Sequence, residues 1–127
     1  MRSIILISAK ELDLIRMAES YSDIGSVDLQ ALRRIVIEGD WGWFAITIDD
    51  ALAEEFSDSE VAEIEKDIDE PSFAQLEFSS TFAGDLAVRT MPVDTEILID
   101  NDHGLIRSIE YIRLRIQAGL EWQTSST

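Results

Sequence analysis

The sequence predicts a mixed α/β or α+β domain with a central sheet of about four to five strands and three to four helices. Two observations support this prediction. Apolar runs typical of strands are interleaved with segments in which apolar residues recur at helical spacing. The chain has 127 residues, of which 46% are hydrophobic and 28% charged, which fits one globular domain with a single core. We expect this domain to span residues 1–122, with residues 123–127 as a frayed tail.

The first part of the chain predicts a buried strand followed by a helix. Residues 4–7 are four consecutive aliphatic residues, a pattern typical of a strand that is buried on both faces. Ser8 and Glu11 have the spacing of a capping box, so we expect the first helix to begin there. Leu12 and the apolar residues after it recur at helical spacing, and the polar run before Gly25 should end the helix.

A hairpin is expected next. Residues 26–29 suit a short turn, and residues 32–37 and 42–48 read as two strands. The sequence Glu38-Gly39-Asp40 between these strands provides a tight-turn signal, so they should pair with each other.

Residues 49–70, called the acidic segment below, hold eleven acidic residues and a single basic one, Lys66. Asp49 or Asp50 can cap a first helical turn, and Ser57 with Glu60 forms a capping box for a helix. The apolar residues of this helix define one stripe, which leaves the acids on the solvent side. The stripe consists of Val61, Ile64 and Ile68.

The last part of the chain predicts two more strands and two helices. Residues 72–79 alternate as a strand does, and residues 96–100 read as another strand. Residues 81–90 favour a short helix, with a strand as the alternative. Residues 105–116 carry apolar positions at helical spacing, and Gly119 is well placed to end this helix. Leu120 and Trp122 should fold back onto the domain.

The overall charge narrows the classes of partner. The formal net charge is −16 and the pI is about 4.1, which argues against direct binding to nucleic acid or to an anionic membrane, because both require a cationic surface. The absence of cysteine excludes disulfides and thiolate metal sites. With no apolar run long enough for a signal peptide or a membrane span, we expect a cytoplasmic protein. We expect no cofactor, because no cofactor-binding motif is present.

The acidic segment is the candidate surface for a basic protein partner. Tryptophan is frequent at the centres of protein interfaces, so the two tryptophans that precede the segment in sequence are added to the candidates, and we expect both on one face of their strand. The alternative is an acidic surface that serves only solubility or adaptation to salt. The candidate partner-binding residues are Trp41, Trp43, Asp49, Asp50, Glu54, Glu55, Asp58, Glu60, Glu63 and Asp67.

One other stretch offers residues with chemical potential. Asp100, Asp102 and His103, the only histidine, follow a predicted strand and offer oxygen and imidazole ligands for a divalent cation; Asp100 could instead orient His103 as a general base. The structural interpretation is a strand-to-helix turn, because Asn, Asp and Gly are the residues such turns use and Asp102 suits a helix N-cap. No other catalytic motif is present, so we expect no catalytic residues.

A small cysteine-free α/β domain with an acidic face and neighbouring aromatic residues resembles the immunity proteins of bacterial contact-dependent and polymorphic toxin systems. The resemblance covers physical character and no motif. It implies an antidote that covers the active site of a basic, nuclease-type toxin without catalysis of its own. Two alternatives stay open: a DNA-mimic inhibitor of a nucleic-acid enzyme, in which carboxylates replace phosphates, and a small metal-dependent enzyme that uses Asp100, Asp102 and His103.

Overall fold

Seven strands, all paired antiparallel, form one sheet in the order β2-β3-β4-β5-β1-β6-β7 in the computed structural model, which describes residues 2–127. The fold is therefore α+β, within the predicted class, but the sheet is larger than the four to five strands expected. The strands are β1 (Arg2–Ser8), β2 (Ser26–Gln30), β3 (Arg34–Gly39), β4 (Gly42–Ile48), β5 (Ser72–Phe78), β6 (Ile97–Asp100) and β7 (Ile106–Ser108); the helices are α1 (Leu14–Tyr21), the 3-10 helix η1 (Asp50–Glu55), α2 (Asp58–Glu65), α3 (Thr81–Thr90) and α4 (Ile109–Gln117).

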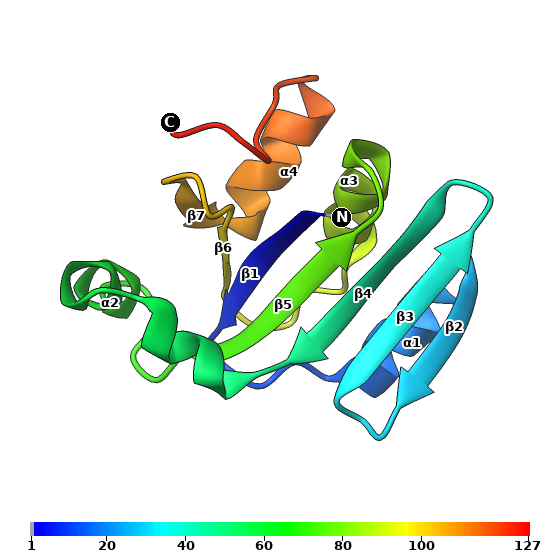
Figure 1. Cartoon of the computed structure of the whole chain (residues 1–127), viewed down its shortest axis with the longest axis horizontal. Coiled ribbons are helices and arrows are strands. Elements are labelled where there is room, and N and C mark those ends of the chain that lie inside the picture. Colours follow the sequence, from blue (N-terminus) through cyan, green and yellow to red (C-terminus); the bar gives the residue numbers. More distant parts are fainter. Residues whose placement is uncertain (1) are drawn as a thin grey trace.

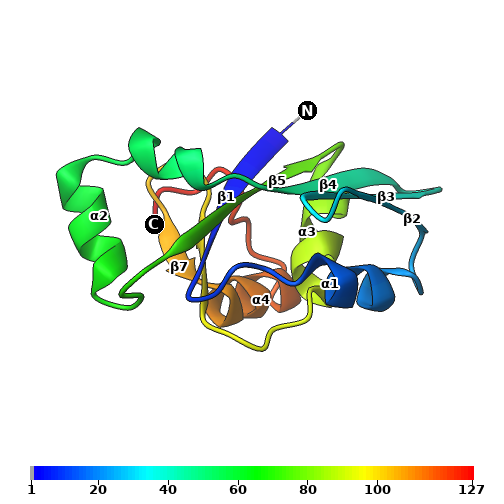
Figure 2. The same cartoon turned by 90° about the horizontal axis from the view of Figure 1, so that it is seen from below.

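The helices lie on the two sides of the sheet unequally. Helices α1, α3 and α4 cover one face (Figure 1), and the view from below shows them together under the strands (Figure 2). Helix η1 lies on the opposite side, with α2 beyond it near β7 (Figure 2). The second face is thus covered only at one end of the sheet.

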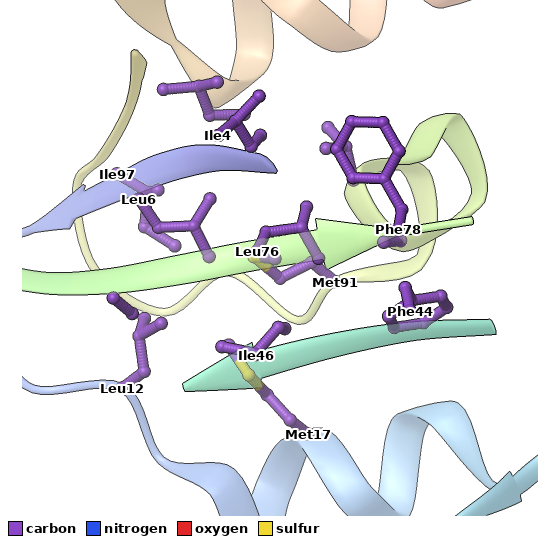
Figure 3. Close-up of a cluster of buried hydrophobic side chains, with 14 of the residues drawn as sticks. Ile4, Leu6, Leu12, Met17, Phe44, Ile46, Leu76, Phe78, Met91 and Ile97 are labelled. Atoms are coloured by element: carbon purple, nitrogen blue, oxygen red, sulfur yellow. The ribbon is translucent and has the colours of Figure 1, made fainter. Parts of the chain in front are cut away.

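The main hydrophobic cluster lies between the sheet and helices α1, α3 and α4. Successive strand side chains point to opposite faces, and the members of each strand in this cluster alternate accordingly, as Ile4 and Leu6 do in β1 and Phe44 and Ile46 do in β4 (Figure 3). The Tyr21 hydroxyl donates to the carbonyl of Ala87 at 2.8 Å, which ties α1 to α3. This cluster holds most of the buried apolar residues of the domain.

A second, smaller cluster lies on the other face of the sheet. Ile7 in β1 and Leu98 in β6 are paired across the strands, and they pack with Leu52 of η1 and with Ile64 and Ile68 of the α2 region. The burial on both faces that the apolar run at residues 4–7 predicts is therefore found for Ile4, Leu6 and Ile7, whereas Ile5 is half-buried. The single core expected from composition is divided in two by the sheet.

Several predicted elements are confirmed. Residues 34–39 and 42–48 form the hairpin predicted for residues 32–37 and 42–48, so the first strand begins and ends two residues later than expected; Ile35 and Ile37 are fully buried. Strand β5 has Ala74, Leu76 and Phe78 in the main cluster. The ambiguous residues 81–90 are a helix, α3, whose N-cap is Ser80.

The predicted start of the first helix is wrong. Ser8 is the last residue of β1, where it pairs with Ser72 of β5, and its Oγ donates to the carbonyl of Lys10 at 2.5 Å. Helix α1 begins at Leu14, because the Asp13 carboxylate accepts from the backbone N–H groups of Ile15 and Arg16. Strand pairing therefore extends β1 through the residue predicted as the cap.

Two other segments were also assigned wrongly. The turn expected at residues 26–29 is strand β2, paired with β3 at the edge of the sheet. The helix expected over residues 105–116 is divided: residues 106–108 form edge strand β7, and α4 begins at Ile109 after Ser108, whose Oγ accepts from the N–H of Tyr111 at 3.2 Å. Gly119 follows α4 with φ +73°, as its expected role requires.

The C-terminal residues are fixed to the domain by polar contacts. Trp122 is buried, as predicted, and its Nε1 donates to Asp85 at 2.7 Å, whereas Leu120 is exposed. Gln123, which we had assigned to a fraying tail, is also buried, and its Nε2 donates to the carbonyl of Thr81 at 2.9 Å.

Asn101 connects this tail to the turn after β6. Its side chain is 1% exposed, and its Nδ2 donates at 2.7 Å to the carbonyls of both Trp122 and Ser125. Its Oδ1 accepts from the N–H groups of His103 and Leu105, at 2.9 and 3.1 Å. One buried amide thus satisfies four backbone groups.

Candidate functional site

The acidic segment begins with two carboxylates that have structural roles. Asp49 is the N-cap of η1, and its Oδ1 accepts from the N–H of Ala51 at 3.1 Å. The Oδ1 of Asp50 accepts from the N–H of Phe73 at 3.2 Å, which joins the start of η1 to β5. These two acids therefore position the segment as well as contributing charge to it.

Helix α2 begins with the predicted capping box. The N–H of Glu60 donates to the Ser57 hydroxyl at 3.3 Å, and the N–H of Ser57 donates to Oε1 of Glu60 at 3.0 Å. Asp58 and Glu60 lie in the first turn, where negative charge interacts favourably with the helix dipole. The acids at this end of α2 thus favour the helix that carries them.

Apolar residues attach the acidic segment to the sheet. Ile64 and Ile68 are 1% and 2% exposed, and the ring of Phe56 lies 5.5 Å from that of Phe73 in a tilted contact. Burial of a side chain of this size contributes about 1.5–3 kcal/mol. The predicted stripe is confirmed for Ile64 and Ile68, whereas Val61 is half-buried.

Ten of the eleven acids of the segment are exposed, and Asp49 is half-buried. Lys66 forms an ion pair with Glu63 at 3.0 Å, and both side chains are exposed, so this pair contributes little to stability. Among residues 2–127 no other salt bridge involves the segment. Its negative charge is consequently almost uncompensated. The exposed acids are Asp50, Glu54, Glu55, Asp58, Glu60, Glu63, Glu65, Asp67, Asp69 and Glu70.

The two tryptophans do not lie next to this surface. They are at the start of β4, whereas the acidic segment begins after its end, roughly 20 Å away along the strand. The expectation that both point to one face is also wrong: Trp41 stacks on Phe44 of the main cluster at 5.5 Å, and its Nε1 donates to the carbonyl of Ile24 at 3.0 Å. Trp43 is half-buried and precedes Phe44 in β4, so its side chain points to the other face of the sheet; its backbone N–H donates to the Ser79 hydroxyl at 3.0 Å. Trp41 is explained by packing alone.

The turn after β6 does not bring its three candidate ligands together. Oδ1 of Asp100 accepts from the N–H of Asp102 at 2.9 Å, and no hydrogen bond links Asp100 to His103 among the described residues. Asp100 and His103 line different hollows of the surface. Asp102 adopts φ +63° and caps no helix, because the N-cap of α4 is Ser108. Within residues 2–127, no three acidic or histidine side chains are placed to share a metal ion.

Asp100 instead lies beneath the acidic segment. It pairs with Ile5 across β1 and β6, so both side chains point to the face of the sheet that η1 covers. Asp100 as a residue is 6% exposed. Burial is the main reason that its pKa is raised; the N–H of Asp102 lowers it, and the charges of Asp102 and Glu60 raise it further.

Asp100 ends the strand predicted at residues 96–100, and the sequence did not associate it with the acidic segment. The signal was available in the alternation of β6, where Ile97 and Ile99 belong to the main cluster and Leu98 to the second. Asp100 continues the register of Leu98. Its position under η1, by contrast, depends on tertiary contacts that no local pattern encodes.

These features define an acidic α+β domain in which most of the charge is concentrated in one layer on a seven-stranded antiparallel sheet. No protein-family model matches the chain, no curated protein matches its sequence, and no solved structure matches its fold. In the part of the chain that the structure describes, none of the helices combines the length and the apolar character needed to cross a membrane.

Proposed function

We propose that this protein binds and inhibits a basic protein partner through the acidic segment, and that it acts as an immunity protein against a nuclease-type bacterial toxin. The observation that supports the proposal is the uncompensated charge of η1 and α2. Eleven acids stand in 22 consecutive residues with one lysine, and that lysine is paired within the segment. A layer with this charge attracts cationic surfaces over about 10 Å at moderate salt.

The structure of the segment suits a binding role. Like charges on neighbouring helix positions destabilise a helix, so the acids of α2 do not benefit the helix beyond its first turn. The apolar side of the segment is buried in the second cluster, which holds the charged side outward. A nuclease that binds nucleic acid has a cationic surface, and an acidic layer of this kind is complementary to it.

Mimicry of DNA receives less support from the dimensions of the segment. Helix α2 has eight residues and is about 12 Å long, whereas one turn of B-DNA is about 34 Å. We therefore favour recognition of one basic partner over replacement of an extended duplex.

The first experiment is capture of the partner from cells of the source organism, followed by mass spectrometry and a toxicity assay with the captured protein. Association rates with the purified partner are then measured across a range of salt concentrations. For wild type, we expect rates that can reach about 10⁸ M⁻¹s⁻¹ at low salt and fall steeply as salt rises.

The decisive comparison uses two charge-reversed variants. Glu63→Lys with Asp67→Lys changes two exposed acids of the acidic segment, and Glu19→Lys with Asp23→Lys makes the same change in charge at the end of α1. The first variant should associate at least about tenfold more slowly at low salt, and the control should stay closer to wild type. Equal rates for both variants at every salt concentration would show that the acidic segment is only a solvated surface.

A further inference from the structure

A pocket of about 520 Å³ lies between the acidic segment and the sheet. Its floor comes from β1 and β5, where Ile5 and Gln75 are paired, and from Asp100 at the end of β6. The side opposite this floor is formed by η1, by Phe56 and by the first turn of α2. The pocket is far larger than the space that one water molecule occupies, about 30 Å³, and it is open to solvent.

The chemistry of the lining is divided between carboxylates and apolar groups. Four acids line the pocket, and neither lysine nor arginine does. Leu52, Phe56 and Ile5 provide an apolar surface beside them. The acids are Glu55, Glu60, Asp100 and Asp102.

Asp100 distinguishes this pocket from the exposed acids around it. The residue is more than nine-tenths buried, and of its two carboxylate oxygens only Oδ1 is engaged, with the N–H of Asp102 at 2.9 Å. Within residues 2–127 no group donates to Oδ2 or forms a salt bridge with this carboxylate. A buried carboxylate without a counter-charge is costly, and its raised pKa reflects that cost.

We infer that this pocket receives one lysine or arginine side chain of the basic partner, with its cationic group between Glu60 and Asp100. The inference rests on the proposed function, since it names the contact through which the acidic segment would hold its partner. Long cationic side chains place their methylene groups on apolar surface and their charge in a polar environment, and Leu52 and Phe56 next to two carboxylates offer that combination.

A side chain fits this site better than a metal ion does. A hard cation needs several oxygen ligands around one point, and no three acidic side chains of residues 2–127 are placed in this way. A lysine or arginine, by contrast, needs only one or two carboxylates, because its stem is held by apolar contacts. The bound cation would also supply the counter-charge that Asp100 lacks, which makes a charge-assisted hydrogen bond.

The test uses a probe and not the partner itself. We would titrate ¹⁵N-labelled protein with the peptide acetyl-Gly-Gly-Lys-Gly-Gly-amide at low salt, and with the same peptide carrying norleucine in place of lysine. We expect saturable amide shifts concentrated around the pocket, at Ile5, Phe56, Glu60 and Asp102, for the lysine peptide only. No saturable shift at millimolar peptide, or the same shifts with norleucine, would overturn the inference.

Three variants separate the pocket from the general charge of the segment. Asp100→Asn keeps the shape of the side chain and an oxygen that can accept from Asp102, and it should weaken lysine-peptide binding about tenfold, the value of one charge-assisted hydrogen bond. Glu60→Gln, which keeps the capping oxygen, should act in the same direction and tests the second carboxylate of the site independently. Glu65→Gln makes the same charge change on α2 outside the pocket and should change binding less than about twofold.

The outcomes also separate this inference from the proposed function. If all three variants weaken peptide binding equally and the shifts spread along α2, the pocket is not a site. If the captured partner binds Asp100→Asn as tightly as wild type but associates slowly with the Glu63→Lys, Asp67→Lys variant, the pocket is again excluded and the proposed function stands. The proposed function itself fails if the association rate with the partner does not fall as salt rises.

Discussion

Replacing Asn101 by alanine should destabilise the domain more than any other polar substitution in its turn. The buried amide makes four hydrogen bonds with backbone groups of the turn and of the C-terminal tail. Each contributes about 0.5–1.5 kcal/mol net, and a buried group left without a partner costs about 1–3 kcal/mol. The N–H of Leu105 and the carbonyl of Trp122 are buried, whereas water can reach the other two groups more easily. We therefore expect Asn101→Ala to lower the free energy of unfolding by about 3 kcal/mol.

Urea denaturation and thermal melts followed by circular dichroism measure this change. For a domain of this size, a loss of about 3 kcal/mol corresponds to a decrease in Tm of roughly 10–15 °C. His103→Ala is the control in the same turn, because the imidazole is exposed and makes no side-chain hydrogen bond among the described residues; its effect should lie within about 0.5 kcal/mol. An Asn101→Ala variant as stable as His103→Ala would refute the assignment of the amide as the anchor of the tail.

Three further predictions concern charge and backbone. The pKa of Asp100 is raised in the folded state, so folding becomes less favourable when this carboxyl group is charged. This cost is present above the folded pKa and absent below the ordinary aspartate pKa. In melts, Asp100→Asn should therefore raise Tm at pH 7 and have almost no effect below about pH 4. Repulsion within the acidic segment should be screened by salt, so Tm should rise between low salt and about 0.5 M salt, and should rise less in the Glu63→Lys, Asp67→Lys variant. Gly42 has φ +121°, and a Cβ there would collide with the Ser79 hydroxyl, so Gly42→Ala should lose about 1–3 kcal/mol in urea titrations; an unchanged midpoint would contradict that strain.

Local patterns were sufficient for the elements that have a clear alternation or a clear capping signal. The alternation of β5 and the capping box at Ser57 identify elements that the structure contains. The edges of the sheet were missed for a physical reason. Strand β2 alternates over only five residues and is half-buried, and β7 has three residues, so neither has a pattern long enough to outweigh the turn and helix signals around it.

The candidate site was predictable in part. Because charge is a property of the sequence, the acidic segment and its outward side could be identified directly, including Glu63 and Asp67 as exposed residues. Adjacency in sequence does not place Trp41 and Trp43 beside the acidic segment, because the length of β4 separates them from it in space. The burial of Asp100 under η1 requires the pairing of β1 with β6 and could not be read from its neighbours in the chain.

The division of the apolar residues by the sheet has a consequence for how this protein can change over generations. The second cluster involves Leu52, Ile64 and Ile68 from the acidic segment and is separated by the sheet from the main cluster. Effects of substitutions at distant sites without shared partners on the free energy of unfolding are nearly additive. Replacement of the outward acids therefore does not change what the main cluster contributes to that free energy. If the proposed function holds, the outward acids of the segment can therefore change in step with a changing partner, provided that its apolar anchors and the capping groups of Asp49, Ser57 and Glu60 are retained.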